Sequence, residues 1–465
     1  MTSRHRGRQP RALYLSFYFP PSRASGVYRA RATANHLVAE GWDVTVMAAP
    51  LKFLHEAVGS VDEKLAETVD DRIHVERPRL NQFIWERDVR RFGRFRQAMP
   101  VTARYVYDLG QRIFPEHYAS WGWACVRRAL RLHARRPFDV VLATGNPFAS
   151  FAAAWLFHRL TRVPYVVDYR DSWTLDLFAD EPAFDDDHPV WSWERRVLRG
   201  ASRAVFVNEA LRGWHAERYP EVADRTMVVP NGWDPDLLDV TDGTSVAQPD
   251  GPAAPLRFSY LGTVTNNQPV EELVEAFRLA RQHPDLSDAV LNVFGHLGFF
   301  KGSDVRLLER LGLDAATGQT EDAGTGVRYR GPVAKTDVAA AYAESDVLVF
   351  LAGGARYVTS GKIFEYMASG RPIVSVHAPG IAATEVLDGY PLWFNADSLD
   401  PEQIAQSMIA AGKAARDLTP EARATAVRHA ARYTRQRVLV PLEAELRHLA
   451  GAAPREERMD EAVSA

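Results

Sequence analysis

The stretch ALYLSFYFPPSRASGVYRARATANHLVAEGWDVTVMA (residues 12–48) decides the fold class. Its apolar run at 12–19 is typical of a buried strand, and a loop rich in Pro and Gly follows it. A helical stretch at 28–40 and a second strand-like run at 43–48 come next. Two strands joined through a helix-length crossover form a βαβ unit, so this stretch predicts a parallel sheet.

Short apolar runs and helix-length segments alternate through the rest of the chain as well. Further strands of the N-terminal half are predicted at residues 139–143, 164–167, 204–207 and 226–229. Residues 237–255 are rich in Asp, Gly, Pro, Ser and Thr without a periodic apolar face, which predicts a linker. Beyond it the pattern restarts, with strands predicted at 256–260, 289–294, 327–329, 347–350 and 372–376, and helices at 270–282 and 335–344. The sequence therefore predicts an α/β fold with two Rossmann-like, doubly wound domains.

Length and composition limit the class of protein. A chain of 465 residues is longer than one hydrophobic core usually organises, and 46% hydrophobic with 25% charged residues is typical of globular domains. The net charge of -3 gives no overall field for nucleic acid, which is therefore not expected as a partner. Cys125 is the one cysteine and cannot form an internal disulfide, which favours a reducing cytoplasm and a buried thiol. The N-terminus leads into the first strand rather than forming a signal peptide, and no apolar run has the length of a membrane-spanning helix.

An arginine-rich insertion interrupts the N-terminal half. Residues 85–112 interleave aromatic side chains with seven arginines, which are Arg87, Arg90, Arg91, Arg94, Arg96, Arg104 and Arg112. A basic amphipathic helix of this kind can lie on an anionic membrane surface. The alternative is a helix that covers the domain with a solvated face, on which Glu86, Asp88 and Asp108 balance part of the charge.

The segment SGKIFEYMASGRP (residues 360–372) combines the groups that a nucleotide sugar needs. A predicted helix at 363–369 begins beside a glycine, where backbone N–H groups and the helix dipole can face phosphates. Lys362 would supply a countercharge, and Glu365, about one turn later, could accept hydrogen bonds from two ribose hydroxyls. An ordinary charge pair at a helix start is the alternative for these two residues.

This segment, continued to Val374, resembles the signature of the bacterial family 4 retaining glycosyltransferases. The segments that resemble the same family, in the same order, are YFPPSRASGVYRARATANHLVAEGWDVTVM (18–47), PYVVDYRDSWT (164–174), VVPNGWDPD (228–236), SYLGTVTNNQPVEELVEAF (259–277) and VRYRGPV (327–333). The likeness extends from residue 13 to residue 435. Each motif is weak alone, and their common order makes the set specific.

The resemblance implies a GT-B architecture, in which two Rossmann-like domains face each other across a cleft and a C-terminal helix crosses back. The implied parts are an acceptor-binding domain at 1–240 with the insertion at about 80–135, a nucleotide-sugar-binding domain at 255–425, and a C-terminal helix and tail at 426–465. It also implies retaining transfer from a nucleotide-sugar co-substrate, with no metal and no further cofactor. The acceptor would be a carbohydrate, a lipid-linked molecule or a small molecule, in polysaccharide, glycolipid or natural-product biosynthesis. Such an enzyme would be cytoplasmic, with the insertion as a candidate for peripheral contact with the inner face of the membrane.

Carried over residue by residue, the resemblance also implies a donor site. Its residues are Gly26, Gly262, Thr263, Gly331, Ser360, Gly361, Lys362, Ile363 and Glu365. Gly26 would let the backbone approach the donor phosphates or the acceptor; the alternative is that it only completes a turn. Asn231 and Gly232 resemble a turn of the family near the cleft, and most such turns are structural.

Three residues are implied to act in the transfer itself. Asp168 or Asp171 would stabilise oxocarbenium-like charge or orient the acceptor hydroxyl, and Lys362 would stabilise the departing diphosphate. Asp171 could instead form a structural pair with Arg170. In the helix after the first loop, Arg29 or Arg31 would meet an acceptor phosphate, or lie as a solvated helix arginine. The acidic run at 185–187 is interpreted as solvated surface rather than as a metal site.

Three positions depart from the family pattern. Tyr357 stands where many members have a Glu, and Thr263 and Gln268 stand where many have the Arg and Lys that neutralise the diphosphate. A less compensated diphosphate weakens transition-state stabilisation, so Lys362, Arg356 or an N-domain arginine would have to compensate. Two other interpretations therefore remain open: a catalytically weak nucleotide-sugar-binding or scaffolding protein, and a GT-B phosphorylase or epimerase.

Overall fold

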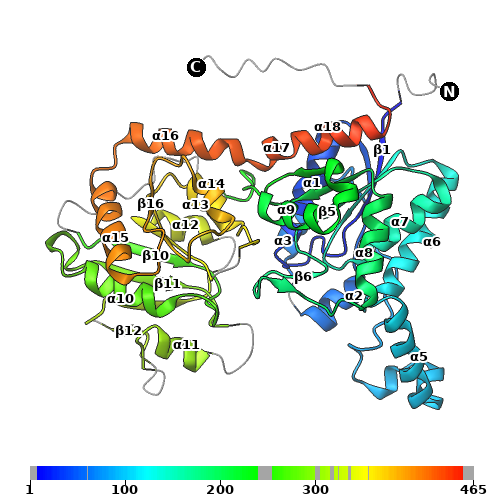
Figure 1. Ribbon diagram of the computed structural model, residues 1–465, viewed down its shortest axis with the longest axis horizontal. Helices are drawn as coiled ribbons and strands as arrows, with labels where there is room; N and C mark the ends of the chain where they lie inside the picture. The colour runs from blue at the N-terminus through cyan, green and yellow to red at the C-terminus, as the bar shows by residue number, and fades with distance from the viewer. Residues whose placement is uncertain are drawn as a thin grey trace. The chain divides into compact units, whose positions relative to one another are not determined.

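The computed structural model describes residues 8–59, 61–238, 254–298, 304–314, 319–322, 324–333, 337–353 and 356–453. These residues belong to two compact units (Figure 1). The first unit contains the chain up to Asp176, Glu181–Pro230 and the segment from Val438 onward. The second unit contains Asn231–Arg437 together with Leu177–Asp180. Most of the predicted linker lies outside the described residues.

The first unit is built on a seven-stranded sheet whose described pairs are all parallel, in the order β3-β2-β1-β4-β5-β8-β9. Its strands are β1 (Arg11–Leu15), β2 (Asp43–Met47), β3 (His74–Glu76), β4 (Val140–Thr144), β5 (Tyr165–Tyr169), β8 (Arg203–Phe206) and β9 (Thr226–Val228). A small hairpin joins β6 (Leu175–Asp176) to β7 (Glu181–Pro182). The strand order is that of a doubly wound fold, which confirms the predicted class.

Helices of the first unit follow the strands along the chain (Figure 1). They are α1 (Val27–Ala39), α2 (Leu51–Phe53), α3 (Glu63–Glu67), α6 (Ala119–Arg135), α7 (Ala149–Thr161), α8 (Pro189–Gly200), α9 (Glu209–Arg218) and α18 (Val440–Leu449). β1, β4 and β5 are buried along their whole length, as expected for parallel strands covered on both faces. Cys125 lies on α6 and is fully buried, as predicted.

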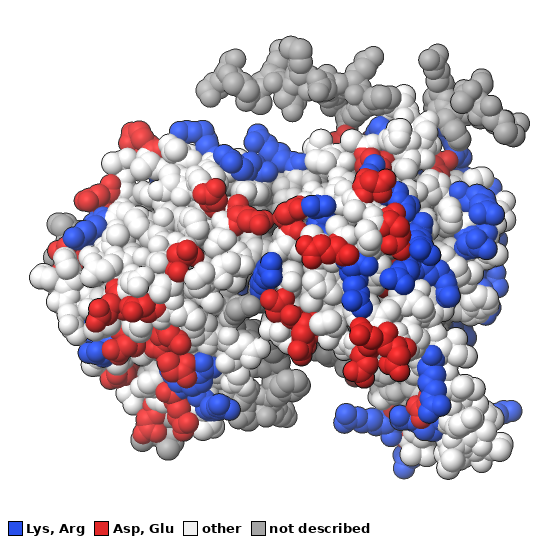
Figure 2. Space-filling model, viewed as in Figure 1, with Lys and Arg blue, Asp and Glu red and all other residues white. Residues whose placement is uncertain are grey.

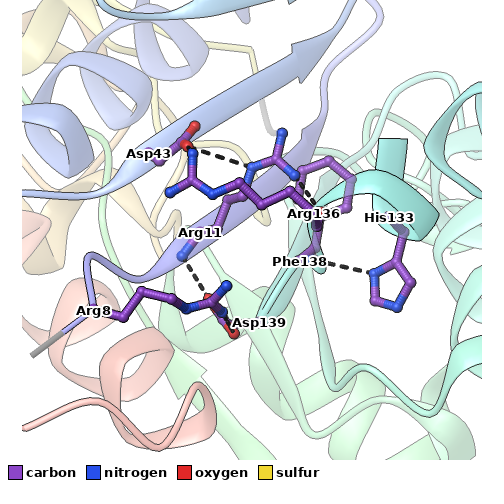
Figure 3. A network of polar contacts seen from close by, with 7 residues as sticks. All are labelled: Arg8, Arg11, Asp43, His133, Arg136, Phe138 and Asp139. Atoms are coloured by element: carbon purple, nitrogen blue, oxygen red, sulfur yellow. Dashed lines mark hydrogen bonds and ion pairs between the residues drawn. The ribbon is translucent and has the colours of Figure 1, made fainter. Parts of the chain in front are cut away.

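Charged residues join the strand starts at the amino-terminal edge of this sheet (Figure 3). Asp139, just before β4, accepts a hydrogen bond from the backbone N–H of Arg11 at 2.8 Å and pairs with Arg8 at 2.5 Å. Arg136 pairs with Asp43 at the start of β2. This edge is therefore occupied by structural contacts, and the loops at the opposite, carboxyl edge are where ligands of such sheets bind.

The second unit repeats the pattern with the strand order β12-β13-β11-β10-β14-β15-β16, in which only the β12 pairing is antiparallel. Its strands are β10 (Arg257–Leu261), β11 (Val290–Phe294), β12 (Glu321–Asp322), β13 (Val327–Gly331), β14 (Val347–Leu351), β15 (Ile373–Val376) and β16 (Trp393–Asn395). Its helices are α10 (Val270–Ala280), α11 (Asp304–Arg310), α12 (Val338–Ala343), α13 (Lys362–Ala368), α14 (Ala383–Leu387), α15 (Pro401–Arg416), α16 (Pro420–Ala430) and α17 (Arg435–Val438).

Two hydrophobic clusters fill the two faces of the second sheet. One packs α10 and α15 on the sheet through residues such as Phe277 and Met408. The other packs α13 and α16 on the sheet through residues such as Phe364 and Ala426. A second Rossmann-like unit is therefore confirmed.

The C-terminal helix implied within 426–465 is interrupted rather than continuous. α16 passes into a 3-10 turn (Ala431–Tyr433) and α17, and α18 begins anew with Pro441 in its first turn. Proline fits a helix only there, because it has no N–H for a bond inside the helix. α18 belongs to the first unit, where Glu443 accepts a hydrogen bond from Trp42 at 2.8 Å and Leu442 and Leu446 are buried.

The arginine-rich insertion forms two helices, α4 (Arg94–Ala98) and α5 (Pro100–Ile113). The chain breaks between them because Pro100 starts α5. Figure 1 shows α5 standing away from the sheet of the first unit. No helix among the described residues is both long and apolar enough to cross a membrane.

Candidate functional site

The first group of candidate residues lies in the loops at the carboxyl edge of the first sheet. A Cβ on Gly26 would lie 2.0 Å from Nη1 of Arg170, so glycine is required for the guanidinium to lie against the start of α1. Arg170 Nη2 donates to Oδ2 of Asp171 at 2.6 Å. The Asp171 side chain remains 41% exposed, so its carboxylate is paired and still reachable.

Asp168 is placed differently from Asp171. Its side chain is 1% exposed, and its two oxygens accept bonds from Nη2 and Nε of Arg29 at 2.8 and 2.9 Å. Burial alone would lower the pKa of Arg29, but the charge of Asp168 outweighs it and raises that pKa. The third Arg29 nitrogen donates to the carbonyl of Pro230 at 3.0 Å. Asp168 thus fastens β5 to α1, and Asp171 is the carboxylate at the surface.

The prediction that Arg29 or Arg31 meets an acceptor phosphate is corrected by these contacts. Both side chains are only 2% exposed. Arg31 donates to the hydroxyl and the carbonyl of Thr68, and Arg29 is bound to both oxygens of Asp168. The periodicity of the helix did not show that these arginines lie on its covered face, where a buried cation requires a partner.

A buried polar network supports the loop that carries Asp171. The hydroxyls of Thr174 and Tyr219 both donate to Oε2 of Glu194, the latter at 2.7 Å. His215 Nε2 lies 3.5 Å from the other Glu194 oxygen and 3.4 Å from the hydroxyl of Ser172. Burial raises the pKa of Glu194, and these partners more than reverse the effect, so the net direction is downward.

Sequence reasoning missed this network altogether. Glu194 and His215 lie on α8 and α9 and are 0% and 1% exposed. A Glu and a His on two helices distant from the motif give no local signal, because only the tertiary fold brings them to the loop.

The second group of candidate residues surrounds the turn after β10 in the second unit. A Cβ on Gly262 would lie 2.2 Å from Nζ of Lys362, so the ammonium reaches back from α13 into space that only glycine leaves open. Gly262 donates to the carbonyl of Phe294 at 2.7 Å, and Gly295 donates to that of Gly331 at 2.8 Å. Backbone hydrogen bonds therefore join the loops after β10, β11 and β13, and the lysine lies over the first of them.

Gly295 contacts Gly262 and was not among the predicted donor-site residues. Its φ is +141°, and a Cβ there would lie 1.8 Å from the carbonyl oxygen of Gly262. The position after β11 was visible in the sequence, but its backbone angle was not. Gly331 has φ +74° with open space beside it, consistent with a turn that leaves room for a ligand.

Glu365 lies on the same helix as Lys362. Its Oε2 accepts a hydrogen bond from the hydroxyl of the buried Tyr342 at 2.9 Å. Ser360 Oγ accepts from the backbone N–H of Lys362 at 3.4 Å, and Gly361 precedes the helix with open space around it. Ile363 is fully buried in the core, so only its backbone can reach a ligand.

Two neutral residues, Thr263 and Gln268, stand where many members of the family have the Arg and Lys that neutralise the diphosphate. Gln268 donates to the hydroxyl of Tyr260 at 3.0 Å and to the carbonyl of Leu351 at 3.1 Å, and accepts from the backbone of Thr265 at 2.8 Å. The Tyr260 hydroxyl donates in turn to the carbonyl of Thr263 at 2.9 Å. Gln268 therefore has a structural role, since it holds the turn after β10. The ammonium of Lys362 lies 6.0 Å from the centre of the Tyr260 ring.

The other positions singled out in the sequence are Asn231, Tyr357 and the acidic run at 185–187. Asn231 donates to the carbonyl of Thr359 at 3.3 Å, which ties its turn to the segment before Ser360. Tyr357 is buried, with the guanidinium of Arg356 5.5 Å from its ring centre. In the acidic run, Asp186 is 94% exposed and lies 3.4 Å from Arg218. The described residues contain no group of three or more side chains arranged to hold a metal ion.

Two family models match this chain. The glycosyl transferase 4-like domain matches residues 26–232, and the glycosyl transferases group 1 domain matches residues 255–412. No curated protein matches the sequence.

Solved structures with a similar fold cover nearly the whole chain. A glycosyltransferase from Rickettsia africae is 13% identical with a TM-score of 0.63, over 95% of this chain and 98% of that one. Sucrose-phosphate synthase from Thermosynechococcus elongatus is 15% identical with a TM-score of 0.61, over 96% and 100%. Anabaena HepE in complex with UDP and glucose is 16% identical with a TM-score of 0.55, over 93% and 98%. At such identities the structures establish the fold.

Proposed function

Since this chain is a glycosyltransferase of the GT-B fold, with a glycosyl transferase 4-like domain followed by a group 1 domain, we propose that it moves a sugar from a nucleotide-sugar donor to an acceptor hydroxyl. The donor binds the second unit and the acceptor binds the first. Transfer proceeds with retention and without a metal ion. The resemblance of residues 360–374 to the family 4 retaining enzymes supports retention.

The position of Lys362 over Gly262 carries the donor-site proposal. An ammonium held over Gly262, whose loop is hydrogen-bonded to the loop after β11, provides the countercharge for a diphosphate. α13 has only seven residues, so the lysine rather than the helix dipole supplies most of that charge. Glu365, fixed by Tyr342, accepts hydrogen bonds from the ribose hydroxyls.

The chemistry divides between the two groups of residues. The bond between the anomeric carbon and the diphosphate oxygen breaks, and the electron pair leaves with the diphosphate, which Lys362 stabilises. The acceptor oxygen forms the new bond to the anomeric carbon, and its proton passes to the departing diphosphate oxygen. Asp171, exposed and oriented by Arg170, positions that acceptor hydroxyl.

One observation favours a second candidate, a nucleotide-sugar-binding protein with little catalytic activity. Gln268 is committed to three hydrogen bonds, so the position that carries a cation in many relatives is structural in this chain. Slow release of nucleotide from UDP-, GDP-, ADP- and dTDP-sugars separates the candidates, because a binding protein would leave every donor intact. Formation of a 2-epimer would instead indicate an epimerase.

Calorimetry with Lys362→Gln and Glu365→Gln tests the donor site. The nucleoside diphosphate that gives the largest thermal shift is compared with the corresponding nucleoside. Lys362→Gln should weaken diphosphate binding about tenfold to a hundredfold and leave nucleoside binding unchanged, because only the phosphates meet the ammonium. Glu365→Gln should weaken the binding of both the nucleoside diphosphate and the nucleoside, since both contain the ribose.

Two exposed residues of the same unit provide matched controls. Lys413→Gln on α15 and Glu385→Gln on α14 remove the same charges away from the loops after β10 and should leave both affinities unchanged. If the diphosphate binds Lys362→Gln as tightly as the unchanged protein, the donor-site assignment is wrong.

A further inference from the structure

The insertion between β3 and α6 forms an arm, defined here as residues 81–118, that includes α4 and α5. Between residues 84 and 113 it contains seven arginines against three acidic residues, whereas the whole chain has a net charge of -3. In Figure 2 the arm shows blue side chains beside a white, uncharged surface. The charge of the arm is therefore opposite in sign to that of the protein as a whole.

Aromatic residues hold the inner side of the arm together. The guanidinium of Arg96 lies 3.4 Å from the ring centre of Phe92 and 4.3 Å from that of Phe83, and it donates to the carbonyl of Phe83 at 2.7 Å. Tyr107 stacks on Phe83 with ring centres 4.5 Å apart, and its hydroxyl lies 2.6 Å from Nδ1 of His117. These contacts give the arm a defined structure of its own.

The outer side of the arm exposes apolar side chains in a regular pattern. On α5 every fourth residue forms a stripe: Val101 is 82% exposed, Tyr105 66%, Leu109 45% and Ile113 65%. Other exposed apolar residues of the arm are Val89, Phe95, Met99 and Val106. An apolar surface of this extent on a basic background marks an interaction site.

Four exposed arginines of the arm have no acidic partner among the described residues. Within the described part of the chain, no ion pair is formed by Arg87, Arg90, Arg94 or Arg112, all of which are exposed. Arg104 is paired with Asp108, and Arg91 lies 3.1 Å from Glu56. The unpaired cations leave a positive field beside the apolar residues, which suits a partner that is anionic at its surface and apolar beneath.

We propose that the arm docks on an anionic lipid bilayer, with the α5 stripe in the boundary between headgroups and acyl chains. The arginines contact the anionic headgroups, and the apolar side chains are removed from water. A second copy of this chain would bring two positive arms together, so charge disfavours self-association through this surface.

The base of the arm links this docking to the acceptor loops of the first unit. The Tyr118 ring packs on Phe17, after β1, with ring centres 4.7 Å apart, and Glu116 accepts from the backbone of Phe148, after β4, at 2.9 Å. Phe114 packs on Trp173, two residues after Asp171, with ring centres 6.1 Å apart. Docking would therefore present these loops at the membrane, which assigns a lipid-linked acceptor; this step rests on the proposed function.

Vesicle flotation with the full chain tests the docking. We expect binding to vesicles of phosphatidylcholine with phosphatidylglycerol and none to phosphatidylcholine alone. The triple variant Arg87→Gln, Arg90→Gln and Arg94→Gln should bind about a hundredfold more weakly, since each basic residue contributes about a factor of five. A second variant, with Val101→Gln, Tyr105→Gln and Ile113→Gln, should also lose binding at unchanged charge.

The control removes three exposed arginines from α6 instead, with Arg127→Gln, Arg131→Gln and Arg135→Gln, and should bind as the unchanged protein does. If the control loses as much vesicle binding as the triple arginine variant of the arm, overall charge explains the binding and the role of the arm is overturned. Failure of the unchanged protein to float, or a dimer in light scattering that the apolar variant abolishes, would also overturn it. Nucleotide affinity, measured in parallel, reports the donor site independently of the arm.

Discussion

Lys362 illustrates how far single residues can be interpreted from the sequence. Lys362 and Glu365 lie in one short segment, so their chemistry was visible together. The glycine that makes room for the lysine is Gly262, a hundred positions earlier, and only the fold shows that the two meet. The pairing of Asp168 with Arg29 was invisible for the same reason, because it depends on which face of α1 is turned toward β5.

Glu116 predicts a pH dependence of stability. Burial raises its pKa to about 7, while the backbone N–H groups of Phe148 and Tyr118 oppose the shift. The raised pKa means that the folded state holds the proton between about pH 4.5 and 7, whereas the unfolded state releases it, so stability falls as pH rises through this window. Glu116→Gln should remove this loss, which makes the variant more stable at pH 8 by up to roughly 3 kcal/mol.

Urea unfolding between pH 4 and 8 measures this difference. The exposed Glu217→Gln serves as the control, and its stability should follow that of the unchanged protein across the range. Curves for Glu116→Gln and the unchanged protein that run parallel from pH 4 to 8 would contradict the assignment.

At the scale of elements, α8 and α9 support a loop that neither of them contains. Their Glu194 and His215 side chains meet under residues 172–174 and fix the backbone that follows Asp171. The sequence predicted that β5 ends in a charged loop, and this is where Asp171 is found. It gave no indication of the support, since buried polar pairs between helices have no periodic signature.

Removing His215 should lower the free energy of unfolding more than neutralising the carboxylate of Glu194 does. His215→Ala removes the imidazole that lies 3.5 Å from one Glu194 oxygen and leaves that oxygen buried without this neighbour, at a cost of about 3 to 5 kcal/mol. Glu194→Gln retains an oxygen for Thr174 and Tyr219 and should cost about 1 kcal/mol. In the double variant the cost of His215→Ala should shrink by at least about 1 kcal/mol, as measured by a double-mutant cycle in urea. Additive costs would show that the two side chains are not coupled.

The arm was predicted in part at this same scale. Its composition predicted a single basic helix with aromatic residues. In the structure Pro100 divides this element into two helices. The sequence could not separate Tyr107, which stacks inward on Phe83, from Tyr105, which is 66% exposed. That division decides which residues are available to a partner.

For the whole molecule, the repeated strand and helix pattern was enough to predict two Rossmann-like units. The central strands β1, β4, β10 and β14 are fully or almost fully buried, and their apolar runs were recognised to within a few residues. The edge strands β3 and β16 have three residues each, none of them buried, and were missed because little of the apolar signal survives at a sheet edge.

Truncation after Arg437 should affect the two units unequally. It removes Leu439, Leu442 and Leu446, each at most 1% exposed, and the Glu443 carboxylate that accepts from Trp42. The first unit should lose most of its stability, because burying one leucine contributes about 2 to 3 kcal/mol. The second unit should still bind nucleoside diphosphate. Calorimetric scans with and without nucleotide separate the two transitions.

A milder variant keeps this test informative if the truncated chain does not fold. Leu446→Ala should destabilise only the transition that nucleotide does not shift, by about 3 kcal/mol. A loss in the nucleotide-sensitive transition would show that α18 stabilises the other unit.

The return of the chain to the first unit has a consequence for biosynthesis. A ribosome makes the sheet of the first unit, then about two hundred residues of the second unit, and only afterwards α18. At about 5 to 20 residues per second, this interval lasts on the order of 10 to 40 s. The first unit is thus begun first and completed last, and the face that receives Leu442 and Leu446 is uncovered during translation. That face is where a chaperone would bind the nascent chain.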